Sequence, residues 1–355
     1  MASSSSLVKL LSILLIIISI FAEQAVSVAP DECQTEVNSC TNKKKAVPLK
    51  VIAIFSILIA SIIGVCSPLF TKSIPALNPD RDLFTIVKCF ASGIILATGF
   101  MHVLPDSFEM LSSQCLKEHP WHKFPFTGFV AMLSALVTLM IDSMATSIYS
   151  RKSSAGITPV NGAGSATNDM AVVNIGQFHG HGHHHDAKPA DQHQQLLRYR
   201  VIAMVLELGI VVHSVVIGLS LGASNNTCTI KGLVAALCFH QMFEGMGLGG
   251  CILQAEYKAF KKFVMAFFFS VTTPFGIAMG MALSKTYKDN SPTALITVGL
   301  LNASSSGLLI YMALVDLLSA EFMGPKLQGS IKLQLKSCVA ALLGAGGMSV
   351  MAIWA

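Results

Sequence analysis

Two histidines and a glutamate stand inside long apolar runs, where a polar side chain is costly. His213 lies near the middle of the run 199–222, and His240 and Glu244 lie near the middle of the run 230–253. Because His240 and Glu244 are four residues apart, a helix would place them on one face, with Cβ atoms about 6 Å apart. Imidazole and carboxylate groups together suit divalent zinc, iron, manganese or cobalt. The pattern predicts a metal site built from these three side chains.

Pairs of glycines four residues apart accompany the candidate ligands. They form Gly218-x-x-x-Gly222 in the first run and Gly245-x-x-x-Gly249 in the second. Small residues at this spacing let two helix backbones approach closely inside a bilayer. We therefore expect the two runs to pack against each other along these glycines, which would bring His213 to the other two candidate ligands.

The alternative to a metal site is that these polar groups only form hydrogen bonds between helices. A single intramembrane histidine fits that reading as well as it fits a metal site. Two histidines and a glutamate at one depth favour the metal site, because ionisable residues inside spans usually mark function. An intramembrane metalloprotease would need a motif such as His-Glu-x-x-His, which the chain lacks. We therefore expect no enzymatic activity.

The composition indicates that the elements holding these residues cross a membrane. Hydrophobic residues make up 53% of the chain and charged residues 12%, whereas soluble chains carry about 25% charged residues. Apolar runs of about 20 residues match the hydrocarbon thickness of a bilayer when they are helical. The chain is therefore predicted to be an all-α integral membrane protein with eight transmembrane helices after a cleaved signal peptide. The eight runs are 48–71, 83–104, 126–149, 199–222, 230–253, 260–284, 293–317 and 333–354.

Residues 1–27 read as the signal peptide. Lys9 precedes a short apolar core, which is followed by the small residues Ala25, Ser27 and Ala29. An uncleaved signal anchor is the alternative, but the core is shorter than a spanning helix, which favours cleavage. Residues 28–47 would then form an extracellular N-terminal segment, in which Cys33 and Cys40 could bridge.

Charge patterning orients the predicted helices. A cleaved signal and eight spans place both termini outside, and the predicted inner loops hold more Lys and Arg than the outer loops, as the positive-inside rule expects. Residues 48–149 carry transmembrane helices 1–3, and residues 199–355 carry helices 4–8. Between them, the polar stretch 150–198 cannot bury a core, so we expect a disordered cytosolic loop.

The cytosolic loop holds a second cluster of histidines, namely His179, His181, His183, His184 and His185. Neutral imidazoles on flexible glycine spacers can chelate zinc or a similar ion. Because the loop lies outside the membrane, we expect this regulatory cluster to sense or buffer metal rather than to carry it.

Further polar side chains inside the runs predict a path for the ion. His102, Asp106 and Glu109 follow i, i+4, i+7 spacing at the outer end of the second run, although Pro105 can bend this face. We expect them to line the outer approach, with His102 as a further ligand. The inner halves of later runs carry three carboxylates that would form an exit path, namely Asp142, Glu207 and Asp316. For Asp106, Glu109 and Asp316, the alternative is a helix-end carboxylate that meets lipid headgroups.

The two central runs resemble a family signature. His213-Ser214-x-x-x-Gly218 and His240-Gln241-x-x-Glu244-Gly245 resemble the signature of the ZIP metal transporters, and most closely the plant iron-regulated transporter branch. The resemblance extends over the whole mature chain. It implies transport of divalent ions (iron(II), zinc, manganese, cobalt or cadmium) into the cytosol by alternating access. It also implies that His213, His240 and Glu244 are ligands, with Ser214 and Gln241 beside them on the pathway.

The chain departs from relatives that hold two metal ions side by side. Those relatives use Asn, Asp and two Glu where this chain has Ser214, Gln241, Ile217 and Thr273. The resemblance therefore implies a site for one ion.

The remaining expectations concern partners and location. We expect no resident cofactor, because the divalent ion is the transported substrate, and we expect the lipid bilayer but no nucleic acid as a partner. A homodimer stays open. The plasma membrane is the expected location, with a vacuolar or other internal membrane as the alternative. A membrane metal sensor without net transport is the alternative function.

Overall fold

The computed structural model describes residues 40–70, 81–155, 189–284 and 291–353. These residues are almost entirely helical, and the described part contains one isolated β-bridge, between Thr41 and Asn226. The predicted signal peptide, Cys33 and the histidine cluster of the cytosolic loop lie outside the described residues.

Eight long helices make up most of the described chain. They are α2 (Lys43–Phe70), α3 (Asp82–Thr98), α6 (Phe126–Ala155), α7 (Pro189–Ala223), α8 (Thr227–Gln254), α9 (Ala259–Leu283), α10 (Pro292–Tyr311) and α13 (Ile331–Met351). Two of them are continued by a π-helical segment and then by a short α-helix. Helix α3 is followed by η4 (Gly99–Val103) and α4 (Leu104–Leu111), and α10 is followed by η5 (Met312–Ser319) and α11 (Ala320–Phe322). The short helices α5 (Glu118–Trp121) and α12 (Pro325–Gln328) lie in connections.

Seven helical stretches of the described residues are long and apolar enough to cross a membrane. They match seven of the eight predicted runs, which confirms a helical integral membrane protein. The exception is the run 230–253, which lies in the 28-residue helix α8. Its apolar character is reduced by several glycines and by His240, Gln241 and Glu244. The candidate ligands thus weaken the hydropathy of their own helix, and the eighth span stays a prediction.

Several helices are longer than the sequence predicts. The second and sixth stretches run over Asp82–Leu111 and Pro292–Phe322, each with a π-helical segment inside. Pro105 does not end the second stretch: it stands directly after η4, and the backbone remains helical through Val103 and Leu104 into α4. Helices α6 and α7 also extend into both ends of the range 150–198 that was assigned to a loop.

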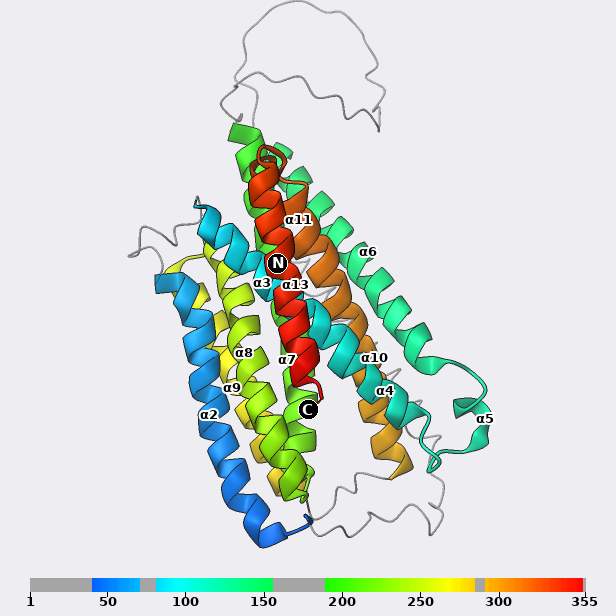
Figure 1. Cartoon of the computed structure of the whole chain (residues 1–355). Coiled ribbons are helices and arrows are strands. Elements are labelled where there is room, and N and C mark those ends of the chain that lie inside the picture. Colours follow the sequence, from blue (N-terminus) through cyan, green and yellow to red (C-terminus); the bar gives the residue numbers. More distant parts are fainter. Residues whose placement is uncertain (1–39, 71–80, 156–188, 285–290, 354–355) are drawn as a thin grey trace, which may run out of the picture.

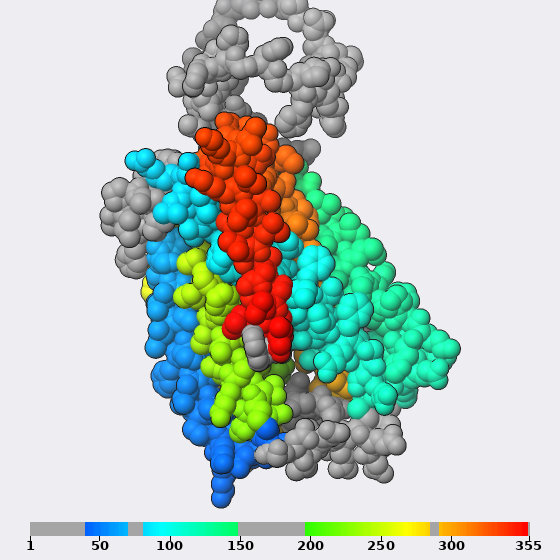
Figure 2. All heavy atoms as spheres, viewed as in Figure 1, coloured from blue at the N-terminus to red at the C-terminus, as the bar shows by residue number. Residues whose placement is uncertain are grey.

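The long helices pack as two groups (Figure 1). In the first group, α2 packs on α8 and α9, and α7 packs on α9. In the second group, α3 packs on α13, and α10 packs on α6 and α4. Figure 2 shows α13 across the middle of one face, between α2 and α8 on one side and α6 on the other. Contacts of α3 with α8 and of α10 with α7 join the two groups.

The glycine pairs pack helices within the first group. A Cβ at Gly222 would lie 2.2 Å from a carbonyl oxygen of α9, and one at Gly218 would lie 2.6 Å from another. Gly245 and Gly249 instead lie against α2, where a Cβ at Gly249 would be 2.4 Å from the Val65 carbonyl oxygen. The prediction that these glycines join α7 to α8 is therefore wrong. Glycine spacing predicts that another helix packs closely against this surface, but it does not predict which helix that is.

A disulfide between Cys40 and Cys228 joins the beginnings of α2 and α8. The suggested Cys33–Cys40 bridge is therefore wrong, since the fold brings Cys40 to a partner 188 residues away, at a Cα–Cα distance of 5.7 Å. Cys115, in the connection between α4 and α5, is also disulfide-bonded. Figure 1 shows the beginnings of α2 and α8 at the same end of the molecule as this connection.

Candidate metal site

Three histidines from three helical segments meet in the interior. The ring centroid of His102 lies 6.2 Å from that of His213 and 6.0 Å from that of His240, and the last two are 6.0 Å apart. The three residues are 4%, 2% and 1% exposed, respectively. His102 comes from η4 in the second group, whereas His213 of α7 and His240 of α8 belong to the first. The site therefore lies at the boundary between the groups.

The π-helical segment η4 carries His102 toward the boundary. Such segments inside α-helices often occur at functional sites, because they change which side chains face inward. His102, Gly99 and Val103 are its buried residues. Gly99 permits a close approach to α10, since a Cβ there would lie 3.0 Å from the Ile310 side chain. The sequence signal for this feature is Pro105, three residues after His102.

Glu244 lies one turn after His240 and is fully buried. Neither of its carboxylate oxygens has a hydrogen-bond partner among the described residues, and the same holds for both ring nitrogens of His213 and His240 and for Nε2 of His102. Leaving a buried polar or charged group without a partner is costly. Unpartnered carboxylate and imidazole atoms gathered at one depth form a donor set that suits a divalent cation.

The three histidine rings lie slightly farther apart than in a site that holds an ion. Among the described residues, no group of three or more His, Cys, Asp or Glu side chains is close enough to hold an ion as placed. Three imidazoles that share one tetrahedral ion, at metal–nitrogen distances of about 2.0–2.1 Å, have centroids roughly 5 Å apart. The observed separations of 6.0–6.2 Å exceed this value only modestly. Small side-chain movements would therefore close the imidazoles on one ion.

The four residues expected to stand in place of the ligands of a second ion are all buried, namely Ser214, Ile217, Gln241 and Thr273. Ser214 Oγ, Thr273 Oγ1 and both side-chain amide atoms of Gln241 have no hydrogen-bond partner within the described chain. Ile217 belongs to an apolar cluster with Ile57, Leu221 and Leu237. These side chains are neutral, so they offer a second divalent ion no anionic ligand.

On the side of the site that faces the α4–α5 connection, Asp106 links His102 to the surface. Its Oδ2 lies 3.9 Å from His102 Nδ1, and its side chain is 41% exposed. Glu109, one turn further, is exposed. The predicted set of His102, Asp106 and Glu109 therefore runs from solvent to a buried histidine.

Of the three carboxylates predicted to form an exit path, the structure brings two together. The Tyr311 hydroxyl donates a 3.5 Å hydrogen bond to Asp142 Oδ2, and Asp142 is an electrostatic neighbour of the buried Asp316. Glu207 is half-buried, and its electrostatic neighbour is Lys261 of α9.

A buried cation, Lys88, lies outside every set of residues predicted from the sequence. It stands in α3 and forms an ion pair with Glu321 of α11 at 2.6 Å. The available signal was a lysine within the apolar run 83–104, where a charge is rare unless it has a partner.

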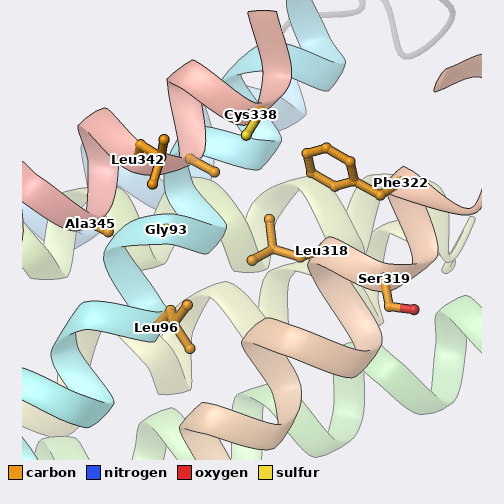
Figure 3. Close-up of a pocket in the computed structure, with 9 residues that line it drawn as sticks. Gly93, Leu96, Leu318, Ser319, Phe322, Cys338, Leu342 and Ala345 are labelled. Atoms are coloured by element: carbon orange, nitrogen blue, oxygen red, sulfur yellow. The ribbon is translucent and has the colours of Figure 1, made fainter. Parts of the chain in front are cut away.

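A separate pocket of about 320 Å³ lies between α3, α13 and the η5–α11 segment. Figure 3 shows Leu96, Leu318, Phe322 and Leu342 lining it, with Ser319 and Cys338 as the side chains that carry heteroatoms. Because it offers no imidazole or carboxylate, this pocket does not belong to the metal pathway.

Comparison with known proteins decides the family. Residues 47–352 match the family model described as ZIP zinc transporter. The chain belongs to the ZIP family. It is 67% identical to "Fe(2+) transport protein 1" of Arabidopsis thaliana over 100% of both chains. It is also 65% identical to "Probable zinc transporter 10" of the same plant, over 93% of each chain. Its identity to "Fe(2+) transport protein 1" of Oryza sativa subsp. japonica is 57%, over 92% of this chain and 89% of the relative.

Family membership confirms two predictions from the sequence. The resemblance to ZIP transporters, and to plant iron transporters within them, is correct. The chain is a divalent metal-ion transporter, and the findings do not favour the alternative of a sensor without transport. Members of this family are transporters rather than enzymes.

Proposed function

We propose that this ZIP transporter carries divalent ions, iron(II) and zinc among them, into the cytosol through one site formed by His102, His213, His240 and Glu244. The observation that carries the proposal is the meeting of three buried imidazoles from both helix groups, with ring centroids 6.0–6.2 Å apart. Glu244 supplies negative charge to the ion one turn from His240.

Alternating access follows from the way the two groups share the ligands. Both groups hold the ion when the boundary is closed around it, and a movement of one group against the other separates His102 from His213 and His240. Such a movement exposes a midplane site to one side of the membrane at a time. A negative-inside potential favours inward movement by about 2.3 kcal/mol per charge per 100 mV, or about 4.6 kcal/mol for a divalent ion.

Carboxylates would guide the ion on both sides of the site. Asp106 and Glu109 attract it from outside, since the first lies 3.9 Å from His102 and both reach the surface. Asp142 and Asp316 receive it on the inner side, and Glu207 contributes further negative charge there. Ser214 and Gln241 offer neutral oxygen atoms beside the ligands, which suits one ion rather than two.

The proposed topology has eight spans, with α8 as the fifth, and a signal peptide at residues 1–27 that is cleaved. The disulfide between Cys40 and Cys228 supports an outer location for the ends it joins, because disulfides persist in oxidising compartments. The plasma membrane is the proposed location. His179, His181, His183, His184 and His185 would buffer or sense the imported metal in the cytosol.

Uptake by the purified protein in liposomes tests this function. We expect accumulation of zinc and of iron(II), and competition by an excess of manganese, cobalt or cadmium, because imidazole and carboxylate ligands bind all these ions. Empty liposomes are the control. Failure of the folded, inserted protein to accumulate any of the five metals would rule out the proposal.

A further inference from the structure

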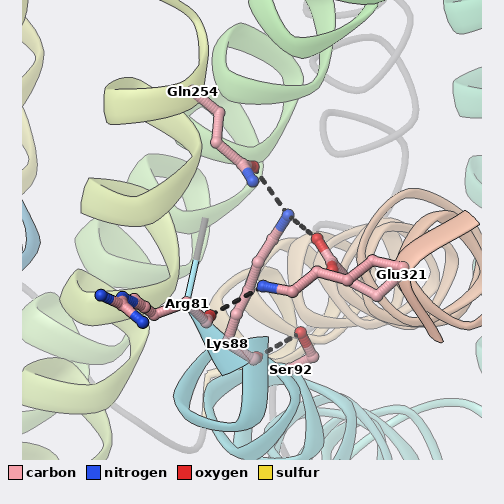
Figure 4. Close-up of polar contacts among 6 residues, drawn as sticks. Arg81, Lys88, Ser92, Gln254 and Glu321 are labelled. Carbon is pink, nitrogen blue, oxygen red and sulfur yellow. Dashed lines mark hydrogen bonds and ion pairs between the residues drawn. The ribbon is translucent and has the colours of Figure 1, made fainter. Parts of the chain in front are cut away.

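Lys88 joins three helical elements at the end of the molecule opposite the disulfides. Its ammonium group donates a 2.6 Å hydrogen bond to Glu321 Oε1 and a 2.7 Å hydrogen bond to Gln254 Oε1 (Figure 4). Gln254 is the last residue of α8, whose first turn carries Cys228. Lys88 is 5% exposed, so its charge depends on these partners rather than on water.

The partners of Lys88 belong to different helix groups. Glu321 of α11 belongs to the second group, as does Lys88 itself in α3. Gln254 belongs to α8 of the first group, and the Lys88 ammonium also lies 5.7 Å from the ring centroid of Tyr199 in α7. One lysine therefore contacts both groups at their inner boundary.

We propose that Lys88 is a gating residue that holds the inner end of the transport pathway closed through Gln254 and Tyr199. The inference rests on the alternating movement in the proposed function. Glu321 keeps the lysine within the second group, and the contacts to the first group are the ones that break when the inner side opens.

The arrangement of charges explains why only part of the cluster needs to break. Removing a lysine from its carboxylate in a buried site would leave two uncompensated charges, which is strongly unfavourable. Losing the hydrogen bond to the neutral amide of Gln254 costs less free energy, because no second charge is left without a partner. Lys326 of α12 also donates a 2.8 Å hydrogen bond to the Arg81 carbonyl oxygen, and it lies 4.0 Å from Asp82. These contacts tie the inner end of α3 to α12, so this part of the second group can move as a unit.

The outer side is arranged differently. Asp106 beside His102 is 41% exposed, whereas Lys88 and Cys251 at the inner boundary are both buried. The structure thus combines a part-exposed carboxylate that contacts His102 on the outer side with buried side chains at the inner boundary. An ion that enters from outside can leave inward only after the contacts of Lys88 with the first group are released.

Thiol labelling tests the gate independently of transport. Cys251 is 2% exposed and lies one turn before Gln254, so it reports opening of the inner boundary. The background variant replaces the other free cysteines among the described residues, namely Cys66, Cys89, Cys238 and Cys338, with serine. A small water-soluble maleimide is then added to inside-out vesicles, and the rate of Cys251 labelling is measured.

Gln254→Leu removes the acceptor on α8 and leaves the Lys88–Glu321 pair intact. We expect it to raise the labelling rate at least about tenfold, since a hydrogen bond to a charged donor is lost from the closed state. Tyr199→Leu should raise the rate by about two- to fivefold, because a cation–π contact is weaker. Gln328→Leu is the matched control, since Gln328 at the same end is exposed and bonds the Phe322 carbonyl oxygen within the second group. It should leave the rate unchanged.

The outcomes separate the gate from the transport function. Unchanged labelling in Gln254→Leu, or an equal rise in Gln328→Leu, would overturn the gate even if the wild-type protein accumulates metal normally. Absence of uptake by the wild-type protein would instead contradict the proposed function. The gate predicts that Gln254→Leu still accumulates metal, because Gln254 is not a ligand.

Discussion

At the scale of single residues, the donor set of the site favours one divalent ion. Two imidazoles from the first group, one from the second and the carboxylate of Glu244 provide four donors, which matches the coordination number of zinc in proteins. The neighbouring polar side chains Ser214, Gln241 and Thr273 are buried and neutral. A second divalent ion beside the first would face repulsion without an added carboxylate to offset it.

This argument predicts the number of ions bound. A variant without residues 179–185, which removes the histidine cluster of the loop, should bind one zinc ion per chain at equilibrium. Adding Glu244→Ala should reduce binding to below that value, because the anionic ligand is lost. Zinc and protein are measured on the same purified sample by elemental analysis. Two ions per chain, both lost in Glu244→Ala, would contradict a site for one ion.

Residue types and helical spacing are enough to select part of this candidate site from the sequence. His213, His240 and Glu244 could be selected because charged or polar groups inside apolar runs are costly and the helical period is known. Spacing also names His102 as a further ligand at the outer approach, but its meeting with the other two histidines depends on the π-helical segment η4. The contacts of Lys88 depend on three elements that are distant in the sequence. Neither can be derived from local spacing.

At the scale of elements, close glycine contacts hold the first group together. A Cβ at Gly64 would lie 2.2 Å from the Met242 carbonyl oxygen of α8, and a Cβ at Gly276 would lie 2.8 Å from a carbonyl oxygen of α7. Such contacts permit backbone approach inside the bilayer, where packing rather than the hydrophobic effect joins helices. The Cys40–Cys228 disulfide joins the beginnings of α2 and α8 in the same group.

Alanine substitutions at glycines distinguish these contacts from open positions. Gly64→Ala should destabilise the protein by about 1–3 kcal/mol, because the added methyl group forces α2 away from α8. Gly346→Ala is the control, since a Cβ there has no neighbour within 4 Å, and it should leave the midpoint of thermal unfolding in detergent unchanged or slightly raised. Equal midpoints for both variants would show that the close α2–α8 contact does not contribute to the stability of the protein.

Prediction from the sequence succeeds for the type and approximate position of the long helices, but not for their full length or for which helices pack together. Apolar runs locate the long helices, because a bilayer sets their minimum length. The glycine pairs of α7 and α8 were expected to face each other, yet they face α9 and α2. A spacing pattern describes the surface of one helix, whereas the choice of partner depends on the shapes of all neighbouring helices.

At the scale of the whole molecule, the candidate site and the proposed gate lie on the same boundary between two helix groups. The histidines bridge the groups within the interior, and Lys88 bridges them near the end of the molecule opposite the Cys40–Cys228 disulfide. Movement of one group against the other therefore alters ligand geometry and inner access together. This coupling is what a carrier needs if it is to release its ion on one side only.

Uptake by substituted proteins tests the central claim most directly. Cells expressing each variant at equal surface levels are assayed for accumulation of labelled zinc and iron(II). His240→Ala and Glu244→Ala should reduce uptake to background, because each removes a ligand. His119→Ala, which alters an exposed histidine, and deletion of residues 179–185 should leave most uptake in place. Loss of uptake on deletion of the loop, together with normal uptake by His240→Ala, would contradict the assignment of the site.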